Sequence, residues 1–295
     1  MNIADRISRI QPSITLEMTA KAAELRRQGV DVINLSVGEP DFDTPENIKD
    51  AAYSAIKNGL TKYTAGSGTP DLKDAIIKKL NRDNNLNFEA NNIIVSCGGK
   101  HSLYNACQVL FQKNDEVIIF TPYWVSFPDF VSITGATPVF VNTDPNKQYE
   151  PNFDELEKAI SKNTKGIIIN SPSNPTGGVW SDEAINRTLD IAKQKKLWVF
   201  SDECYEQLTY DKPFISIQNF DLNNEQILTF QSCSKTYSMT GWRIGYTAGN
   251  EKVIKAMSKL QSQSTSCPNS IAQAAATEAL SGDQSSVISM KETFH

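Results

Sequence analysis

Histidine is scarce in this 295-residue sequence, and its scarcity excludes whole classes of chemistry. The only two histidines are His101 and His295, so a histidine-rich metal site is excluded and a Ser-His-Asp triad could use His101 alone. Catalysis must therefore come from lysine, tyrosine, aspartate or a bound cofactor. We predict no metal site.

A basic surplus and a long apolar run are also missing. Lys and Arg number 29 against 34 Asp and Glu, a formal charge of -5, which argues against nucleic acid or an anionic membrane as a partner. Any anionic ligand must therefore be bound by a local cluster of donors. No apolar run approaches the roughly 18 to 20 residues of a spanning helix, and the N-terminus lacks the apolar stretch of a secretory signal. These features predict a soluble, cytoplasmic protein.

The five cysteines lack the pattern of a disulfide framework or a zinc site. Their number is odd and no C-x-x-C pair occurs, so we expect them to be reduced and mostly buried. Hydrophobic residues make up 39% of the chain, which is enough for a substantial core in one large domain or two smaller ones.

Short β-rich runs alternate with helical patterns from about residue 90 onward. The runs lie near residues 93, 116, 138, 166, 197, 227 and 243. Amphipathic segments such as FDELEKAISKN and SDEAINRTLDIAKQKK lie between them, with Asp154, Ser181 and Asp182 near the expected helix starts. The alternation predicts an α/β fold with a mostly parallel sheet.

The two ends of the chain have a different pattern. Residues 1–45 predict one helix, one short strand and a Gly-Pro turn, which indicates an arm plus part of another domain. A helix over residues 45–58 and another that begins at Pro70 follow. Near the other end we expect helices interrupted at Pro268 and near Gly282.

Lys235 lies in the most informative segment, QSCSKTYSMTGWRIGY. Most lysines are solvated surface charges, but the flanks of this one are not those of a charged surface. A desolvated lysine has a lowered pKa and can form a Schiff base with a carbonyl. Ser232 and Arg243, on either side of it, are suited to bind a phosphate monoester, one by its hydroxyl and one by its planar guanidinium.

Two further segments fit the same ligand. In NSPSNPTGG, Asn174 follows a strand, and open α/β sheets bind ligands at the carboxyl ends of their strands. In VFSDECYEQ, Asp202 ends a buried strand and Tyr205 follows three residues later. A buried aspartate is usually a cap or one half of an ion pair, but a pyridinium nitrogen as partner would also explain its burial.

A strand runs into two glycines and a helix in VSCGGKHSLYNACQVLF. The N–H groups at that helix start would bind an anion, and the glycines allow a ligand to approach the backbone. A nicotinamide-dependent oxidoreductase fits the α/β pattern but not this motif, which is not G-x-G-x-x-G and has no acidic residue at the dinucleotide spacing. A phosphate cradle, a Schiff-base lysine, an acid for a ring nitrogen and donors for a ring hydroxyl together match pyridoxal 5'-phosphate.

The sequence resembles the class I (fold type I) aminotransferases, and within them the bacterial aspartate aminotransferases of the subgroup that includes prephenate aminotransferases. The matching segments lie between residues 12 and 247 and are PSITL, GEPDFDTP, KYTAGSG, GGKHSL, TPYWVS, NSPSNPTGG, SDECYE and SKTYSMTGWRIGY. The resemblance implies a three-layer large domain with a mostly parallel seven-stranded sheet, preceded by an N-terminal arm. It also implies a homodimer.

The resemblance implies a role for each matching residue. Lys235 would hold pyridoxal phosphate as a Schiff base and then move a proton on the substrate. Asp202 would keep the ring nitrogen protonated, while Asn174 and Tyr205 would hydrogen-bond the ring oxygen. The full set of cofactor-binding residues would be Gly99, Lys100, Trp124, Asn174, Asp202, Tyr205, Ser232, Lys235, Arg243 and Tyr63, the last reaching the phosphate of the neighbouring subunit.

The resemblance also implies a substrate-binding group made of Gly38, Thr15, Lys100, Trp124 and Asn174. Trp124 would stack on the cofactor ring, and Cys204 would touch its opposite face. Gly38 would lie against the substrate α-carboxylate, and Thr15 with Lys100 would bind a distal carboxylate. This pair favours a dicarboxylic substrate.

We divide the chain into three parts by the same resemblance. Residues 1–45 would form the arm and part of a small domain, residues 46–282 the cofactor-binding large domain, and residues 283–295 the start of an interdomain helix. The family's C-terminal small domain supplies an arginine that pairs with the substrate α-carboxylate. Because the sequence stops at His295, we expect that domain to be largely absent.

The expected activity is transamination from L-aspartate to 2-oxoglutarate, which gives oxaloacetate and L-glutamate. An alternative within the same fold is a prephenate or aromatic aminotransferase. An alternative from another class is a non-catalytic remnant that binds pyridoxal phosphate, motivated by the expected loss of the arginine. The expected partners are small amino acids, 2-oxo acids and a second copy of the chain.

Overall fold

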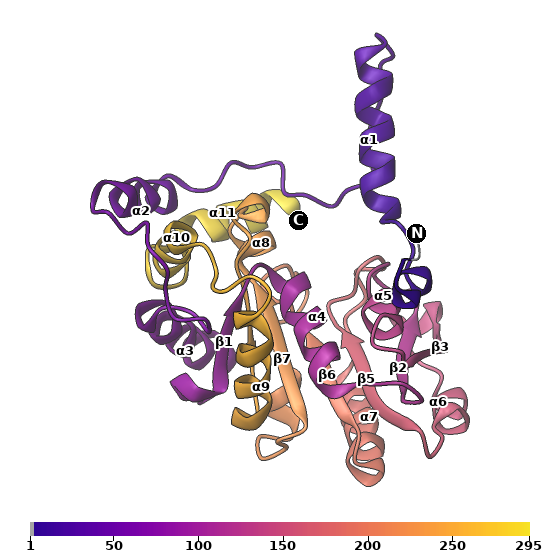
Figure 1. Ribbon diagram of the computed structural model, residues 1–295. Coiled ribbons are helices and arrows are strands. Elements are labelled where there is room, and N and C mark those ends of the chain that lie inside the picture. Colours follow the sequence, from indigo (N-terminus) through magenta and orange to yellow (C-terminus); the bar gives the residue numbers. More distant parts are fainter. Residues whose placement is uncertain (1–2) are drawn as a thin grey trace.

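A mixed eight-stranded sheet with helices on both faces forms the centre of the computed structural model, which describes residues 3–295 (Figure 1). The strand order is β1-β8-β7-β6-β5-β2-β3-β4. The five consecutive strands β7, β6, β5, β2 and β3 run parallel to one another. Strand β8 is antiparallel to both of its neighbours, and β4 is antiparallel to β3. The expected arm starts at residue 1, and residues 1 and 2 lie outside the described part.

Seven of the strands are those predicted from the sequence, and the eighth was missed. The strands are β1 Ile93–Ser96, β2 Glu116–Thr121, β3 Thr137–Asp144, β4 Glu150–Pro151, β5 Thr164–Asn170, β6 Trp198–Asp202, β7 Ile227–Ser232 and β8 Gly245–Ala248. The count of seven is therefore wrong by one, because β4 has two residues and is too short to show an alternating pattern.

The helices follow the sequence pattern closely. They are α1 Ile14–Arg27, α2 Glu46–Lys57, α3 Pro70–Asn84, α4 Gly99–Leu110, α5 Phe127–Ser132, α6 Phe153–Ala159, α7 Asp182–Lys195, α8 Cys233–Thr236, α9 Glu251–Ser262, α10 Ser270–Ser281 and α11 Ser285–Phe294. Ser181 caps α7 as expected, and α3 begins at Pro70. The breaks at Pro268 and near Gly282 are confirmed. The short strand expected before residue 45 is wrong, since residues 28–45 form no strand in the described structure.

Alternating strand residues divide the core between the two faces of the sheet. On one face Val117, Phe200 and Leu228 pack in a single cluster with residues of α4, α5 and α9. On the other face Ile118 and Val199 pack with α7, while the β1 and β8 end of the sheet packs against α2, α3 and α10. The three-layer α/β prediction is confirmed, and the carboxyl ends of β5, β6 and β7 are left as one shared edge.

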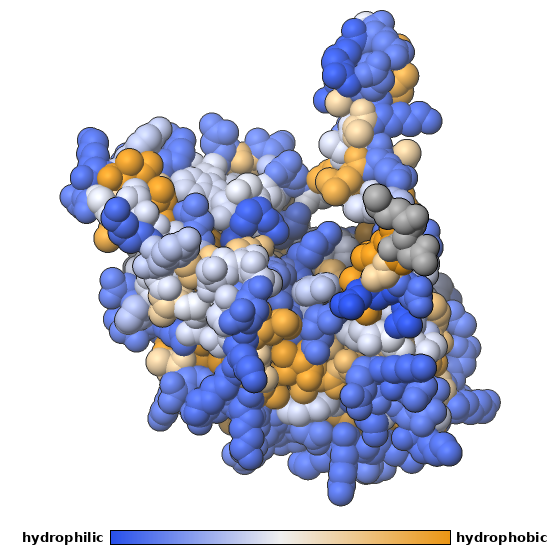
Figure 2. All heavy atoms as spheres, in the orientation of Figure 1, coloured by the Kyte–Doolittle hydropathy of each residue, from blue (hydrophilic) through white to orange (hydrophobic). Residues whose placement is uncertain are grey.

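The N-terminal part of the chain stands away from these layers. In Figure 1, α1 extends from the body as an isolated rod, and an extended segment connects it to α2. Apolar side chains on both are exposed, including Ile14, Leu16, Ile33 and Leu35, and Figure 2 shows apolar atoms on the standing helix. No helix within residues 3–295 is long and apolar enough to cross a membrane. All five cysteines are free; Cys107 and Cys233 are buried, and the other three are half-buried.

Candidate active site

The carboxyl ends of three neighbouring parallel strands bring the predicted functional residues together. Asn170 at the end of β5 pairs in register with Asp202 at the end of β6, and Asp202 pairs with Phe230 of β7. Ser232 is the last residue of β7, and α8 follows it directly with Lys235 in its single turn. Strand register therefore places the acid, the hydroxyl and the lysine at one edge of the sheet.

Lys235 is a largely desolvated amine at this edge. Its Nζ donates a hydrogen bond to the carbonyl oxygen of Gly38, which lies on the extended segment before α2. Burial lowers the pKa of Lys235, and the nearby guanidinium of Arg243 acts in the same direction. A lysine with a lowered pKa has a larger neutral, nucleophilic fraction near neutral pH, which is what Schiff-base formation requires.

Asp202 is 5% exposed and has little to stabilise its charge. Its carboxylate accepts a 3.3 Å hydrogen bond from the backbone N–H of Cys204, and the side chain of the same cysteine is a further, weak donor. Burial raises the pKa of Asp202 to about 6. An ionised carboxylate in this position would gain from a cationic hydrogen-bond donor.

Asn174 and Tyr205 converge beside Asp202. The side-chain amide of Asn174 donates to the phenol oxygen of Tyr205 at 3.2 Å, and burial raises the pKa of that phenol. Asn170 holds the two loops together. Its side-chain oxygen accepts from the backbone N–H of Asn174 at 2.8 Å, and its amide donates to the carbonyl of Asp202 at 3.1 Å. Sequence reasoning did not assign a role to Asn170, although its position at the end of a predicted strand was a signal.

An anion cradle lies at the N-terminus of α4. The backbone N–H groups of Gly99 and Lys100 have no hydrogen-bond acceptor within residues 3–295. Gly98 precedes the helix with a φ of 91°, and a Cβ at this position would lie 2.9 Å from the guanidinium carbon of Arg243. A Cβ on Gly99 would meet the side chain of Ser232 at 3.4 Å. The glycines thus let donors from three chain segments close around a space suited to a phosphate.

Positive charge is concentrated around this cradle, although the chain as a whole is acidic. Burial lowers the pKa of Lys100, and the charge of Arg243 lowers it further. The Nζ of Lys100 lies over the ring of Trp124, 5.1 Å from its centroid. Trp124 in turn contacts Phe127 and Phe130 edge-on. An anion bound among Lys100, Arg243 and Lys235 would relieve the repulsion of Arg243 on the two lysines. This agrees with the expectation that an anionic ligand is bound by a local cluster of donors.

Two of the predicted residues are not brought to this edge within one chain. Thr15 lies on α1, which stands away from the sheet, and its backbone carbonyl accepts from the hydroxyl of Thr19 (Figure 1). Tyr63 lies in the loop before α3 and is 90% exposed. The roles of Thr15 toward Lys100 and of Tyr63 toward a neighbouring subunit stay predictions.

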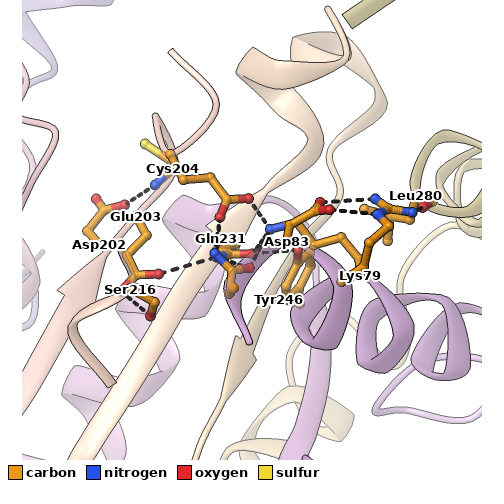
Figure 3. Close-up of polar contacts among 12 residues, drawn as sticks. Lys79, Asp83, Asp202, Glu203, Cys204, Ser216, Gln231, Tyr246 and Leu280 are labelled. Atoms are coloured by element: carbon orange, nitrogen blue, oxygen red, sulfur yellow. Dashed lines mark hydrogen bonds and ion pairs between the residues drawn. The ribbon is translucent and has the colours of Figure 1, made fainter. Parts of the chain in front are cut away.

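A buried polar network behind the site was missed by sequence reasoning. Its centre is an ion pair between Lys79 of α3 and Glu206, surrounded by Glu203, Gln231 and Tyr246 (Figure 3). A single lysine in an amphipathic helix is usually solvated, so nothing in the sequence around Lys79 distinguishes it. The only signal was the dense run of polar residues after Asp202.

These residues fit pyridoxal 5'-phosphate, the cofactor predicted from the sequence. The free N–H groups and glycines of the cradle suit its phosphate. The under-stabilised carboxylate of Asp202 suits a protonated ring nitrogen, the Asn174–Tyr205 pair suits the ring oxygen, and the desolvated Lys235 suits the aldehyde.

Comparison with known proteins gives the same answer. Residues 30–295 match the family model described as aminotransferase class I and II. The chain is 46% identical to the aspartate aminotransferase of Bacillus sp. (strain YM-2) and 47% identical to the aspartate/prephenate aminotransferase of Nitrosomonas europaea. These matches cover 99% and 100% of the chain, and 75% of each relative.

Solved structures agree with the sequence relatives. The aspartate aminotransferase of Thermus thermophilus with maleate superposes with a TM-score of 0.95 at 41% identity, covering 99% of this chain and 76% of that one. The enzyme from Rhizobium meliloti gives 0.94 at 43% identity, covering 100% and 74%. The chain therefore belongs to the class I and II aminotransferases, a family of transferases that depend on pyridoxal phosphate.

Proposed function

We propose that this aminotransferase moves the amino group of L-aspartate to 2-oxoglutarate, giving oxaloacetate and L-glutamate. The convergence of Lys235, Asp202 and the Asn174–Tyr205 pair beside a free helix N-terminus is the observation that supports this activity. Relatives named aspartate aminotransferase at 46% identity support the amino donor, and a related structure holds maleate, which like aspartate carries two carboxylates.

The residues of the chain divide the work of binding and proton transfer. Bound pyridoxal phosphate supplies an electron-withdrawing ring that stabilises negative charge on the carbon bearing the amino group. The N–H groups of Gly99 and Lys100, with Ser232 and Arg243, would hold the phosphate. The carboxylate of Asp202 would keep a proton on the ring nitrogen, because an ion pair there would offset the cost of burying its charge.

Lys235 acts at two stages. Its desolvated Nζ would hold the aldehyde of bound pyridoxal phosphate covalently, and once freed by substrate the same nitrogen would hold and move the proton of the substrate carbon. The lowered pKa matches both roles, since the amine must be neutral to accept that proton. Asn174 and Tyr205 would hydrogen-bond the ring oxygen and so orient the ring toward Lys235.

The substrate carboxylates meet separate groups. Lys100, with its Nζ over Trp124, supplies a positive charge for the distal carboxylate, and we assign Thr15 to the same group. Gly38 is assigned to the α-carboxylate; its carbonyl already receives the hydrogen bond of Lys235, which places this segment at the site.

The domain division and the dimer are part of the proposal. Residues 46–282 contain the sheet and every cofactor ligand from the chain itself, and the arm of residues 1–45 exposes Ile14, Leu16 and Leu35. A second copy that covers these side chains would bring its own Tyr63 toward the phosphate. Sedimentation velocity tests the dimer, and a monomer at micromolar concentration would contradict it.

The activity itself is tested by labelling and by a half-reaction. Protein loaded with pyridoxal phosphate is reduced with borohydride and mapped by mass spectrometry, and the label is expected at Lys235. A parallel sample receives L-aspartate, which is expected to convert the cofactor absorbance to that of pyridoxamine phosphate. Label elsewhere, or no label, would refute the site.

A prephenate or aromatic substrate is the second candidate, favoured by the relative named aspartate/prephenate aminotransferase. Half-reaction rates with aspartate and phenylalanine, and return reactions of the aminated cofactor with 2-oxoglutarate and prephenate, separate the two. Absence of any reaction with aspartate would refute the first proposal. Stable labelling without reaction toward any of these substrates would instead favour a chain that binds the cofactor without turnover.

A further inference from the structure

The short turn after β6 has two sides. Tyr205 bonds Asn174 on the side of the proposed site, whereas Glu206 pairs with Lys79 in the buried network behind it. Figure 3 shows Glu203 reaching into the same network toward Gln231, while Asp202 points away from it. Backbone hydrogen bonds set the path of the turn: the Glu203 N–H donates to the carbonyl of Phe230 at 2.9 Å, the Glu206 N–H to that of Glu203 at 3.1 Å, and the Leu208 N–H to that of Tyr205 at 2.8 Å. The side chains of Glu203 and Glu206 then anchor this turn to the network behind it.

Glu206 is anchored by three residues from distant segments. One carboxylate oxygen is paired with the ammonium of Lys79, and the other accepts from Asn84 at 2.6 Å and from Gln231 at 2.9 Å. Lys79 and Asn84 both belong to α3, and Gln231 precedes Ser232 in β7. The network thus connects the turn that carries Tyr205 to the strand that carries the phosphate ligand.

Each N–H group of the Lys79 ammonium has its own hydrogen-bond acceptor. Its ammonium, on a side chain that is 2% exposed, donates to Glu206, to Asn84 at 2.8 Å and to Gln231 at 2.8 Å. Three donors meet three acceptors, which only the charged form can satisfy. Tyr246 completes the set by donating to Gln231 at 2.7 Å.

Glu203 anchors the start of the turn in the same way. Its carboxylate accepts from Ser201 at 2.8 Å, Ser216 at 2.8 Å, the backbone N–H of Ile217 at 3.0 Å and Gln231 at 3.2 Å. Four donors suit an ionised carboxylate, while burial and the charge of Glu206 raise the pKa of Glu203 to about 7. The only described ammonium that hydrogen-bonds into this network is that of Lys79, so it offsets two neighbouring carboxylates.

We propose that the Lys79–Glu206 pair is a positioning device for Tyr205, holding its phenol at the distance from which it and Asn174 bind the cofactor ring oxygen. This inference rests on the proposed function of the site. The pair itself does not touch the cofactor, and its effect is transmitted by the one-residue step from Glu206 to Tyr205. The titratable groups that act on Tyr205 from the site side are Cys204 and Asp202.

The test uses the pH at which the absorbance band of the bound cofactor changes. A hydrogen bond to the ring oxygen stabilises its deprotonated form, so weakening that bond raises the midpoint. The double variant Lys79→Met with Glu206→Gln removes both charges of the pair, and Glu203 keeps its own four hydrogen-bond donors. We expect its midpoint to rise by about half to one pH unit, in the same direction as Tyr205→Phe and by less.

A structural role alone would not produce the pattern expected next. In the Tyr205→Phe background the double substitution should add no further shift, because the group through which it acts is gone. Lys255→Met, which breaks the exposed Lys255–Glu251 pair of α9, is the matched control and should leave the midpoint unchanged. If the double variant does not fold, Tyr246→Phe, which deletes one hydrogen bond of the network, takes its place and should give a smaller rise.

The outcomes separate this inference from the function on which it rests. An unchanged midpoint in a folded, cofactor-loaded variant refutes the positioning role and leaves the site intact. An additive shift in the Tyr205→Phe background also refutes it, since the pair would then act elsewhere. Failure of the unaltered chain to label at Lys235 would overturn both.

Discussion

Gly245→Ala should open the phosphate cradle without touching any residue that binds the cofactor ring. Gly245 begins β8 and lies against the N-terminus of α4. A Cβ at this position would lie 2.6 Å from the carbonyl carbon of Gly98 and 2.7 Å from the Cα of Gly99, with the Gly99 nitrogen closer still. All three atoms are backbone, so no side-chain rotation can relieve the contact.

The size of the effect follows from these distances. Ordinary carbon contacts lie at about 3.5 to 4.0 Å, so β8 and the helix start must separate by roughly 1 Å. Overpacking of this kind costs about 1 to 3 kcal/mol of unfolding free energy. A displacement of about 1 Å at a binding group can cost about a hundredfold, and we expect the affinity for pyridoxal phosphate to fall by about ten- to a hundredfold.

The assay compares two ligands that differ only in the phosphate. Fluorescence titration with pyridoxal phosphate should show the loss, whereas affinity for pyridoxal should change little, because the ring contacts are intact. Gly241→Ala is the control, since a Cβ there meets nothing within 4 Å. Equal losses for both ligands, or no loss for pyridoxal phosphate, would refute the assignment of the cradle to the phosphate.

Three other substitutions test the remaining parts of the site. Asp202→Asn should stabilise the cofactor-free protein at pH 7.5. Burial raises the Asp202 pKa from 3.8 to about 6, and two pH units correspond to about 3 kcal/mol for ionising the folded state. Between those pH values the folded carboxyl keeps a proton that the unfolded one loses, so the stability gained by the substitution is full above pH 6 and absent below pH 4. Urea unfolding at pH 7.5 and at pH 3.5 measures this gain, and equal gains at both pH values would contradict the reasoning. Lys79→Met should cost about 3 to 5 kcal/mol in urea unfolding by leaving buried carboxylates uncompensated, against about 0.5 kcal/mol or less for Lys255→Met; similar values for the two would show that the buried pair is not special. Lys235→Ala should abolish the borohydride-fixed mass increase with pyridoxal phosphate, and a persistent label would move the Schiff base to another lysine.

The sequence predicted the parts of this molecule that local pattern determines. Strand alternation, the cap at Ser181 and the proline at the start of α3 are local signals, and the structure confirms each. The residues proposed to bind the cofactor could be nominated because they lie in short segments at strand ends, and their roles stay predictions. The network around Lys79 was not, because its members come from α3, the turn after β6, β7 and β8, and only tertiary packing makes that lysine 2% exposed. The two-residue strand β4 was not predicted for a similar reason, since it is defined only by its pairing with β3.

Two adjacent buried carboxylates show how one turn serves both stability and chemistry. Glu203 receives four hydrogen bonds from the protein, which partly offset the burial and the charge of Glu206 that raise its pKa to about 7. Asp202, one residue earlier, receives a single backbone donor, and its charge is left to be stabilised by a ligand. A protonated ring nitrogen that binds there would lower the pKa of Asp202 and recover the free energy that its burial costs in the empty fold. The same burial that makes Asp202 a poor stabilising residue thus makes it a strong binding group for a cationic ring nitrogen.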